Sequence, residues 1–498
     1  MKQLKHKGIL IPIKPDWKKL HILVQGRRVD LTPEQEEMAI AWVKKLGTEY
    51  VEDPIFTKNF FQDFRSALDI KKKIPPEDFD FSLVMKEVEK ERAYKLSLSK
   101  AEKKRLAAER KVLREKNKEK YGHAIVDGVR VEIANYMAEP SSIFMGRGKH
   151  PLRGRWKRGP IKNDIVLNLS PDSPKPVGPW KEILWQQNSM WIAKWIDKLR
   201  GKEKYVWLAD SAPLKQQKDI EKFNKAIELS KKIDDVRKHI LSNLNATDPI
   251  RRKTATVCYL IDALKLRVGD EKDPDEADTV GATTLRSEHV RFGKKGVMTF
   301  DFLGKDAVRW QKQLRPPKQV AKNIQEMIKT ARSSIFEGVR SKHVSFFLDE
   351  VIPGISSKVF RTYHASRVVA DFLYSSAIST LDPEYKKKHV ATMANLEAAI
   401  ICNHKRKPRK NWRESLVKKT ERLKRLKTKG TPTANKRAQI LKYKIQAFRE
   451  SRDYNLGTSL KSYIDPRIYY NWGQKVDFDW KLYYPKALQR KFSWLDRD

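Results

Sequence analysis

A change of pattern near residue 210 constrains the fold of this chain more than any other feature of its sequence. Before it, short apolar runs alternate with prolines and turn residues, which is typical of strands and short helices. From about Leu214 onward, helical periodicity dominates. A chain of 498 residues is also too long for one compact core. We therefore expect an α+β multidomain protein whose second domain begins near residue 210.

Local signals in the first part predict both helices and hairpins. The stretch 81–121 lacks Gly and Pro and contains the capping-box pattern Ser99-Lys-Ala-Glu102, which predicts two long solvated helices, the second beginning at Lys100. Asp127-Gly128 lies between β-branched runs and predicts a hairpin turn, because both turn positions need positive φ. The apolar triplets 183–185 and 190–192 predict a second hairpin, and 205–208 predicts a further strand.

Three segments of the second part depart from the general helical pattern. Residues 284–304 contain strand-like runs. Residues 411–452 form two helical stretches around Lys429-Gly-Thr-Pro-Thr433, and the apolar positions of the second recur at steps of three and four. We interpret them as an antiparallel coiled-coil hairpin with a basic outer face; the alternative is a helical pair packed in a core. The aromatic segment from Tyr454 must dock on another element to be ordered.

The charge of the chain indicates its partner. Lys and Arg number 105 against 62 Asp and Glu, a net charge of +43, so the surface would bind a polyanion, and nucleic acid is the expected partner. No apolar run is long enough to span a membrane, and the basic N-terminus lacks the apolar core of a signal peptide, so we expect an intracellular protein. Cys258 and Cys402 are flanked by apolar residues and suit buried thiols better than a disulfide or a metal site. The phosphate-binding loop of ATPases is absent from the sequence.

Cutting and rejoining a phosphodiester without metal or ATP makes defined chemical demands. A nucleophile must keep the bond energy in a covalent link, cations must neutralise the pentavalent phosphorane, and an acid must protonate the leaving oxygen. Arginine suits the second role because its planar fork donates to two phosphate oxygens, whereas the lysine pKa can fall far enough to deliver a proton. Spacing alone cannot locate such residues, since they can come from anywhere in the chain.

Five collinear sequence blocks resemble signatures of the eukaryotic type IB DNA topoisomerases. They are Ala277-Asp-Thr-Val-Gly281, Phe300-Asp-Phe-Leu-Gly-Lys-Asp306, Lys358-Val-Phe-Arg-Thr-Tyr-His-Ala-Ser366, Ile401-Cys-Asn-His404, and Leu456-Gly-Thr-Ser459 followed by Tyr463-Ile-Asp-Pro-Arg-Ile468. Upstream, Thr57-Lys-Asn-Phe-Phe-Gln-Asp-Phe64 and Phe144-Met-Gly-Arg-Gly-Lys-His-Pro151 resemble pieces of the family's DNA-clamping cap. The resemblance therefore covers nearly the whole chain. We interpret residues 275–278 as an acidic turn that leads into the first block.

The resemblance implies a catalytic role for five residues. Tyr463 would attack the phosphate and form a 3′-phosphotyrosine bond. Arg267 and Arg361 would contact the nonbridging oxygens, and His404 would hydrogen-bond a phosphate oxygen in the transition state. Lys305, at the tip of a β-hairpin, would be the general acid for the 5′-hydroxyl.

Four further residues match positions that touch DNA in the family: Arg147, Lys149, Asp306 and Ser462. Ser462 is a departure, because family members commonly carry Asn before the nucleophile, and that side chain also contacts camptothecin-type drugs. We therefore expect weak camptothecin sensitivity. The arm at 411–452 is shorter than in the animal enzymes, and the charged N-terminal extension of eukaryotic members is missing, which suggests a compact, archaeal, protist or viral form or a trimmed chain.

The implied fold is a bilobed DNA clamp. It would combine a DNA-binding cap lobe at 1–210, a mainly helical, tyrosine-recombinase-like catalytic domain at 211–410, the coiled-coil linker at 411–452 and a C-terminal domain at 453–498 that carries the nucleophile. The enzyme would act as a monomer on double-stranded, preferably supercoiled DNA, with no membrane partner. It would need no cofactor, no ATP and no metal site, with Mg²⁺ at most stimulatory. It would be DNA-associated inside the cell, in the nucleoid or the nucleus according to its source.

Two alternatives remain at this point. A tyrosine site-specific recombinase uses the same Arg, Lys, Arg, His and Tyr chemistry, although recombinases typically carry His where this chain has Lys358. A non-catalytic architectural DNA-binding protein could keep the blocks as scaffold only. The products of the reaction with supercoiled plasmid, and the behaviour of Tyr463→Phe, separate these possibilities.

Overall fold

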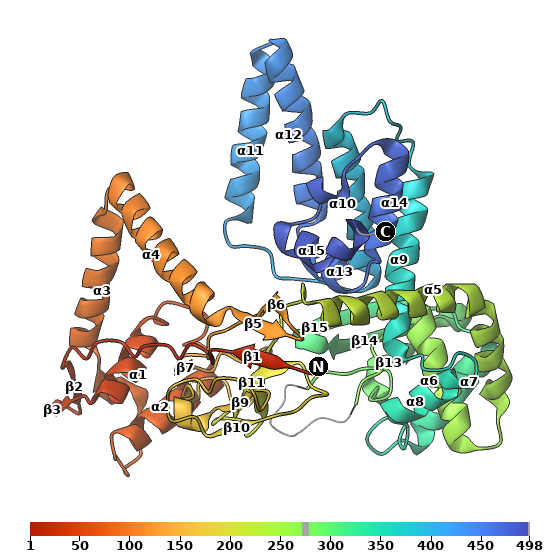
Figure 1. The fold of residues 1–498 in the computed structure, drawn as a ribbon. Coiled ribbons are helices and arrows are strands. Elements are labelled where there is room, and N and C mark those ends of the chain that lie inside the picture. The colour runs from red at the N-terminus through yellow and green to blue at the C-terminus, as the bar shows by residue number, and fades with distance from the viewer. Residues whose placement is uncertain (271–277, 497–498) are drawn as a thin grey trace. The chain divides into compact units, whose positions relative to one another are not determined.

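The computed structural model describes residues 1–270 and 278–496, which divide into two compact units (Figure 1). The first unit is Met1–Lys215, and the second comprises the described residues from 216 onward. The division falls within the first turn of α5 (Pro213–Ser242). The acidic turn expected at 275–278 lies outside the described residues, except for Asp278.

The described strands of the first unit form small sheets, mostly antiparallel, in the orders β3-β2-β4, β1-β5-β6, β7-β8 and β10-β9-β11-β12. The strands are β1 (Leu4–His6), β2 (His21–Val24), β3 (Arg27–Asp30), β4 (Phe79–Asp80), β5 (His123–Val126), β6 (Val129–Glu132), β7 (Ser142–Ile143), β8 (Trp156–Lys157), β9 (Val166–Asn168), β10 (Glu182–Leu184), β11 (Trp191–Ile196) and β12 (Glu203–Trp207). The turn between β5 and β6 is the predicted one, with φ of 49° at Asp127 and 82° at Gly128. The strand expected at 205–208 is confirmed as part of β12.

The helices of the first unit are α1 (Pro33–Val43), α2 (Pro54–Ala67), α3 (Ser82–Ser97) and α4 (Lys100–Tyr121). Phenylalanines of α2 are buried against α1, where the Trp42 and Phe60 rings stack with centroids 4.5 Å apart. Ser99 caps α4 through the predicted capping box, and α4 buries none of its residues. The two long solvated helices expected between residues 81 and 121 are therefore confirmed, and Figure 1 shows them as a helical hairpin.

The second predicted hairpin is wrong. β10 pairs in parallel with β9, and β9 pairs antiparallel with β11, so β9 lies between the two strands expected to be neighbours. The Asn168 side chain holds this arrangement, because it accepts a hydrogen bond from the Gln186 backbone amide at 2.8 Å and donates to the Trp191 carbonyl at 3.1 Å. All three residues of β9 are buried, so the central place of this strand removes more apolar surface from water than a simple hairpin would.

The second unit is mainly helical and contains one described sheet, of order β13-β14-β15. Its elements are α5, α6 (Pro249–Leu264), β13 (Val290–Phe292), β14 (Met298–Gly304), β15 (Val308–Leu314), α7 (Lys318–Thr330), α8 (Ser341–Asp349), α9 (Ser357–Ser375), α10 (Glu384–Ile401), α11 (Trp412–Thr428), α12 (Pro432–Glu450), α13 (Leu456–Ser462), α14 (Pro466–Val476) and α15 (Lys486–Lys491). The strands expected within 284–304 are thus confirmed as β13 and β14.

Helix α9 joins two apolar clusters of the second unit. Its first half, including Phe360, packs with α5, α6, α8 and the sheet, whereas its second half, including Val369, packs with α10 and the C-terminal segment. The C-terminal tryptophans, Trp472, Trp480 and Trp494, are buried in the second cluster, as the sequence led us to expect of a docked segment. Cys258 and Cys402 are both free and buried, as predicted.

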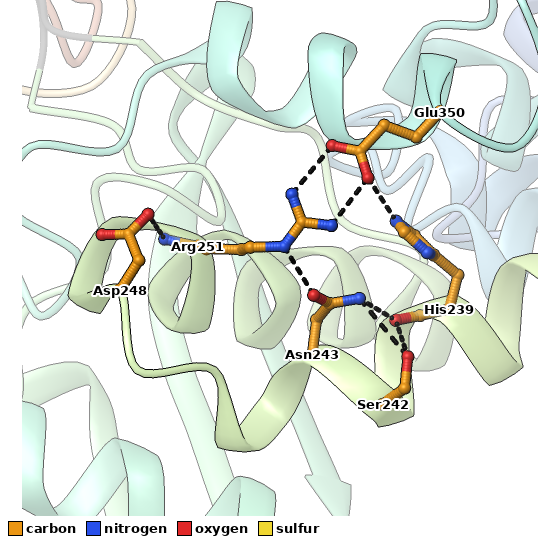
Figure 2. A network of polar contacts seen from close by, with 6 residues as sticks. All are labelled: His239, Ser242, Asn243, Asp248, Arg251 and Glu350. Atoms are coloured by element: carbon orange, nitrogen blue, oxygen red, sulfur yellow. Dashed lines mark hydrogen bonds and ion pairs between the residues drawn. The ribbon is translucent and has the colours of Figure 1, made fainter.

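A polar network fastens three helices of the second unit to one another (Figure 2). Arg251, on α6, donates to both carboxylate oxygens of Glu350, at 2.9 and 2.7 Å. His239, on α5, lies 3.1 Å from the same carboxylate, and Asn243 accepts a further bond from Arg251. These groups are partly exposed, so the network sets the geometry of the helix ends more than it stabilises the fold.

Helices α11 and α12 run antiparallel and are joined by the turn around Gly430 (Figure 1). Trp412 stacks on Phe448 with ring centroids 5.6 Å apart, and α12 buries Ala434, Ala438 and Ile445. The two helices predicted between 411 and 452 are therefore present. Within the described residues, no helix is both long and apolar enough to cross a membrane.

Candidate nucleophile and phosphate site

Tyr463 lies at the centre of a cluster of cationic and polar side chains in the second unit. It follows α13 directly, and its hydroxyl accepts a hydrogen bond from Arg267 Nη1 at 3.2 Å. The Arg361 guanidinium carbon lies 5.0 Å from the centroid of its ring, and the His404 ring centroid lies 5.1 Å away. Four of the five predicted catalytic residues are therefore brought together, although they are spread over almost 200 positions of the sequence.

The backbone of Tyr463 is held by α9. Ser366 Oγ donates to the Tyr463 carbonyl at 3.3 Å and accepts from the Asp465 amide at 3.0 Å. Asp465 in turn caps α14 by accepting from the Arg467 amide. The tyrosine is thus fixed on both sides, by the end of α13 and by the start of α14, so that its hydroxyl rather than its backbone is free to adjust.

Arg361 is held by backbone carbonyls rather than by a carboxylate. It is only 3% exposed; Nη1 donates to the Lys265 carbonyl at 2.6 Å and Nη2 to the Cys402 carbonyl at 2.8 Å. Its Nε is buried and has no hydrogen-bond partner among the described residues. Neutral acceptors orient a guanidinium without cancelling its charge, so this group stays available to an anion.

Arg267 reaches the cluster through a left-handed turn at the end of α6. Lys265 has φ of 59° and stops the helix, and Arg267 follows two residues later. Burial, and then repulsion by Arg361, lower the pKa of Arg267. Arginine nevertheless remains charged in proteins, so two guanidiniums converge on the tyrosine with no carboxylate bonded to either among the described residues. That arrangement is unfavourable when empty and suits an oxyanion such as phosphate.

His404 is neutral in this site. Burial, followed by the charges of Arg361 and Arg267, lowers its pKa from 6.5 to about 3. Its Nε2 lies 3.3 Å from Arg361 Nη2 and its Nδ1 lies 3.3 Å from Ser459 Oγ. Because an arginine can only donate, Nε2 accepts here and Nδ1 carries the proton.

Lys305 lies apart from this cluster. It stands at the tip of the β14–β15 hairpin, as predicted, in a turn where Asp306 has φ of 66° and Ala307 has φ of 57°. Lys305 is exposed and makes no hydrogen bond or ion pair with any residue that the structure describes. The hairpin below it is braced by Arg309, which donates to both carboxylate oxygens of Asp301 at 2.8 and 2.6 Å.

The predicted DNA-contacting residues occupy varied places. Arg147 and Lys149 are exposed in the first unit, next to Gly146 and Gly148, whose φ angles of 56° and 57° lie in the left-handed region. Asp306 is exposed beside Lys305. Ser462 is half-buried at the end of α13, and its carbonyl accepts a bond from Lys222 Nζ at 3.3 Å.

Sequence reasoning missed a hydrogen-bonded triad of α5, α6 and α9 that is centred on the buried Asp262 carboxylate. His364 Nε2, on α9, lies 2.7 Å from Asp262 Oδ1, and Arg237 Nε donates to Asp262 Oδ2 at 2.8 Å. Burial would raise the pKa of Asp262, but the bonds from His364 and Arg237 hold it below its ordinary value. Burial lowers the pKa of His364, while Asp262 opposes that shift. His364 stands within one of the recognised blocks, three residues after Arg361, and helical spacing could have placed it on the same side of α9.

Sequence comparison shows which proteins the chain is similar to. Three family models match the chain: eukaryotic DNA topoisomerase I, DNA binding fragment, over residues 1–208; eukaryotic DNA topoisomerase I, catalytic core, over 211–437; and a C-terminal topoisomerase domain over 435–497.

Curated relatives agree with these models. DNA topoisomerase 1 beta of Arabidopsis thaliana is 35% identical over 541 residues, covering 99% of this chain and 58% of the relative. DNA topoisomerase 1 of Homo sapiens is 32% identical over 543 residues, covering 99% and 70%. DNA topoisomerase 1 of Drosophila melanogaster is 31% identical, covering 99% and 53%. The chain thus spans a little more than half the length of the plant and insect relatives.

Proposed function

Because this chain belongs to the eukaryotic DNA topoisomerase I family, we propose that it is a type IB DNA topoisomerase, which relaxes positive and negative supercoils without ATP. The observation that carries this proposal is the tyrosine hydroxyl bonded to one unneutralised arginine and packed against a second. A tyrosine that served only in packing would need neither cation.

The geometry suggests how the reaction proceeds. The Tyr463 oxygen attacks the scissile phosphorus and its hydroxyl proton passes to solvent water. The phosphorus–O5′ bond breaks, O5′ takes a proton from Lys305, and a 3′-phosphotyrosine forms. Arg267 and Arg361 donate to the nonbridging oxygens as negative charge builds on them, and each such contact is worth about 10²-fold in rate or more. Once phosphate competes for Arg361, neutral His404 changes tautomer: Nδ1 then accepts from Ser459 Oγ, and Nε2 carries the proton and donates to a phosphate oxygen. Religation is the reverse attack by the freed 5′-hydroxyl.

Lys305 supplies the proton for the leaving O5′ in this proposal. Its exposed place at a hairpin tip leaves the ammonium accessible to DNA, and the braced strands below it limit where the tip can move. DNA is what brings Lys305 to the other four residues. Between the two chemical steps the downstream duplex rotates and releases torsional strain.

The same proposal covers the way the enzyme binds DNA, its domains and its cofactor requirement. The two parts of the chain would act as a monomeric clamp around duplex DNA, with preference for supercoiled substrate and with Arg147, Lys149, Asp306 and Ser462 touching the nucleic acid. The cap lobe at 1–210, the catalytic domain at 211–410, the coiled-coil linker at 411–452 and the C-terminal domain at 453–498 are its working parts. The enzyme would be DNA-associated inside the cell. It would need no cofactor, with Mg²⁺ at most stimulatory.

Plasmid relaxation tests the proposal. Wild type is incubated with negatively and with positively supercoiled plasmid in EDTA without ATP, alongside Tyr463→Phe and the control Tyr470→Phe, which changes a half-buried tyrosine of α14 in the same apolar cluster. We expect wild type and Tyr470→Phe to relax both substrates and Tyr463→Phe to bind DNA without forming a covalent adduct.

Two other results would overturn the proposal. Strand exchange at one defined sequence would indicate a site-specific recombinase. Binding without relaxation by wild type would indicate an architectural protein.

A further inference from the structure

The turn that ends α10 places His404 in the site. The His404 amide donates to the Ala399 carbonyl at 2.8 Å and the Asn403 amide to the Ile400 carbonyl at 3.0 Å, with Asn403 at φ of 53°. This closing pattern leaves the carbonyls of Ile401 and Cys402 pointing away from the helix, where they need donors from elsewhere. Arg361 supplies one of these donors, to Cys402.

Lys312, on β15, supplies the other donor. Its Nζ donates to the Ile401 carbonyl at 3.0 Å. The same strand receives a bond in return, because Asn403 Nδ2 donates to the Arg309 carbonyl at 3.0 Å. Two hydrogen bonds therefore join β15 to the turn that carries His404. Since β15 is one arm of the hairpin that ends in Lys305, these bonds connect the proposed general acid to the histidine.

The environment of Lys312 is unusual for a lysine that serves only structure. Burial is the main cause that lowers its pKa to about 8, and repulsion by Lys265, Arg361 and Lys405 adds to it. No carboxylate forms an ion pair with it among the described residues. The carbonyl end of α10 carries partial negative charge, which compensates in part. A neutral side chain would fill this space without the desolvation free energy that a buried ammonium costs. We therefore infer that the charged donor has a function at this position.

We propose that Lys312 is a positioning residue, which sets His404 against Tyr463 by holding the carbonyl end of α10 to the hairpin that carries Lys305. This inference rests on the proposed function for its kinetic readout. Lys312 itself need not touch DNA.

A pH dependence follows from the groups that face Lys312. They are Lys265 at the end of α6, Arg361 on α9, Cys402 after α10, and Lys405. Burial raises the pKa of the Cys402 thiol, so it offers no negative charge near neutral pH. Lys312 is therefore charged below about pH 8 and loses its charge, and with it the stronger hydrogen bond, as the pH rises through that value.

A double-mutant cycle tests this role. Single-turnover formation of the covalent adduct is measured for wild type, Lys312→Met, His404→Ala and the double variant. We expect Lys312→Met to slow wild type about 10-fold or more, a loss within the usual range for coupled neighbours, and to slow the His404→Ala background hardly at all. Wild type should slow as the pH rises above about 8. Lys312→Arg keeps a charged donor, so it should retain most of the rate and lose this expected decline.

Lys387 offers a matched control on α10, the helix whose carbonyl end Lys312 contacts. It is 4% exposed and also donates to carbonyls, those of Thr380 at 2.9 Å and Asp477 at 3.1 Å. It precedes Ile401 by fourteen residues of α10, which places it about 21 Å away along the helix. Lys387→Met should reduce the unfolding temperature without changing the adduct rate of the folded protein or its dependence on His404.

The outcomes separate this inference from the proposed function. Equal slowing by Lys312→Met in both backgrounds would refute the positioning role while leaving the enzyme intact. If wild type formed no adduct, the proposed function would fail, and the ring resonances of His404 in the DNA-free protein would still decide the inference. Those resonances should move in Lys312→Met and stay in place in Lys387→Met; unchanged His404 resonances in both would refute it. If Lys312→Met does not fold, the pH profile of Lys312→Arg provides the answer.

Discussion

His404 provides a quantitative test of the electrostatics of this site. Its pKa falls from 6.5 to about 3 because of burial first and of Arg361 and Arg267 next. A difference of about 3.5 units corresponds to about 5 kcal/mol, at roughly 1.4 kcal/mol per unit, disfavouring the charged imidazole in the folded protein. The ring is only 7% exposed, so solvent screens little of this effect. Replacing the ring by His404→Gln should remove it.

The sign of the effect follows from proton linkage. Between pH 6.5 and about 3, the unfolded chain binds a proton at His404 that the folded protein does not. Stability must therefore fall as the pH drops through this window. Between pH 7 and pH 4.5 the loss from His404 amounts to about 2.5 kcal/mol in the free energy of unfolding. Other histidines with lowered pKa values add losses of the same sign, so the comparison with His404→Gln isolates this one.

Two measurements check the magnitude. Urea unfolding at pH 7 and pH 4.5 should show a pH-dependent loss about 2.5 kcal/mol smaller in His404→Gln than in wild type. NMR titration of the His404 ring should show no protonation above about pH 4. His6, whose pKa burial lowers to about 4, is the control in the other unit, and His6→Gln should leave the His404 titration unchanged. A His404 midpoint above pH 5.5 would refute the reasoning.

Three further changes have expected outcomes. His364→Leu removes one hydrogen-bond donor from the buried Asp262 carboxylate, so urea unfolding should show a loss of about 1–3 kcal/mol in the free energy of unfolding. Single-turnover cleavage should also slow, because α9 and the end of α6 lose a hydrogen bond close to Arg361. Ser462→Asn should increase camptothecin trapping of the cleavage complex, and full trapping of wild type at ordinary drug levels would contradict the family pattern. Glu350→Gln, in the network of Figure 2, should cost less than about 1 kcal/mol on urea unfolding and leave plasmid relaxation unchanged, because its side chain is 41% exposed.

The sequence by itself determined the local structure and named the residues that we propose to react. The capping box at Ser99 and the Asp127-Gly128 turn act within a few residues, so their outcome did not depend on the rest of the fold. Four of the five predicted catalytic residues came from collinear blocks that resemble a family, and Arg267 came from the motif Leu266-Arg-Val-Gly269. The spacing of Tyr463 from Arg267 carries no local signal of its own. The hairpin predicted at 183–192 was wrong, because nothing in the sequence near those residues indicates that β9 lies between the two strands. Local sequence signals therefore do not determine which strands pair.

Only the tertiary structure decided how the site is charged and held. Two guanidiniums meet one tyrosine without a carboxylate among the described residues, and this depends on which carbonyls face Arg361 after folding. The neutral state of His404 and the weakened basicity of Lys312 come from removal of water and from neighbours distant in sequence. Desolvation and charge repulsion depend on distances in three dimensions, so a one-dimensional pattern names these residues, whereas the packed protein sets their chemistry.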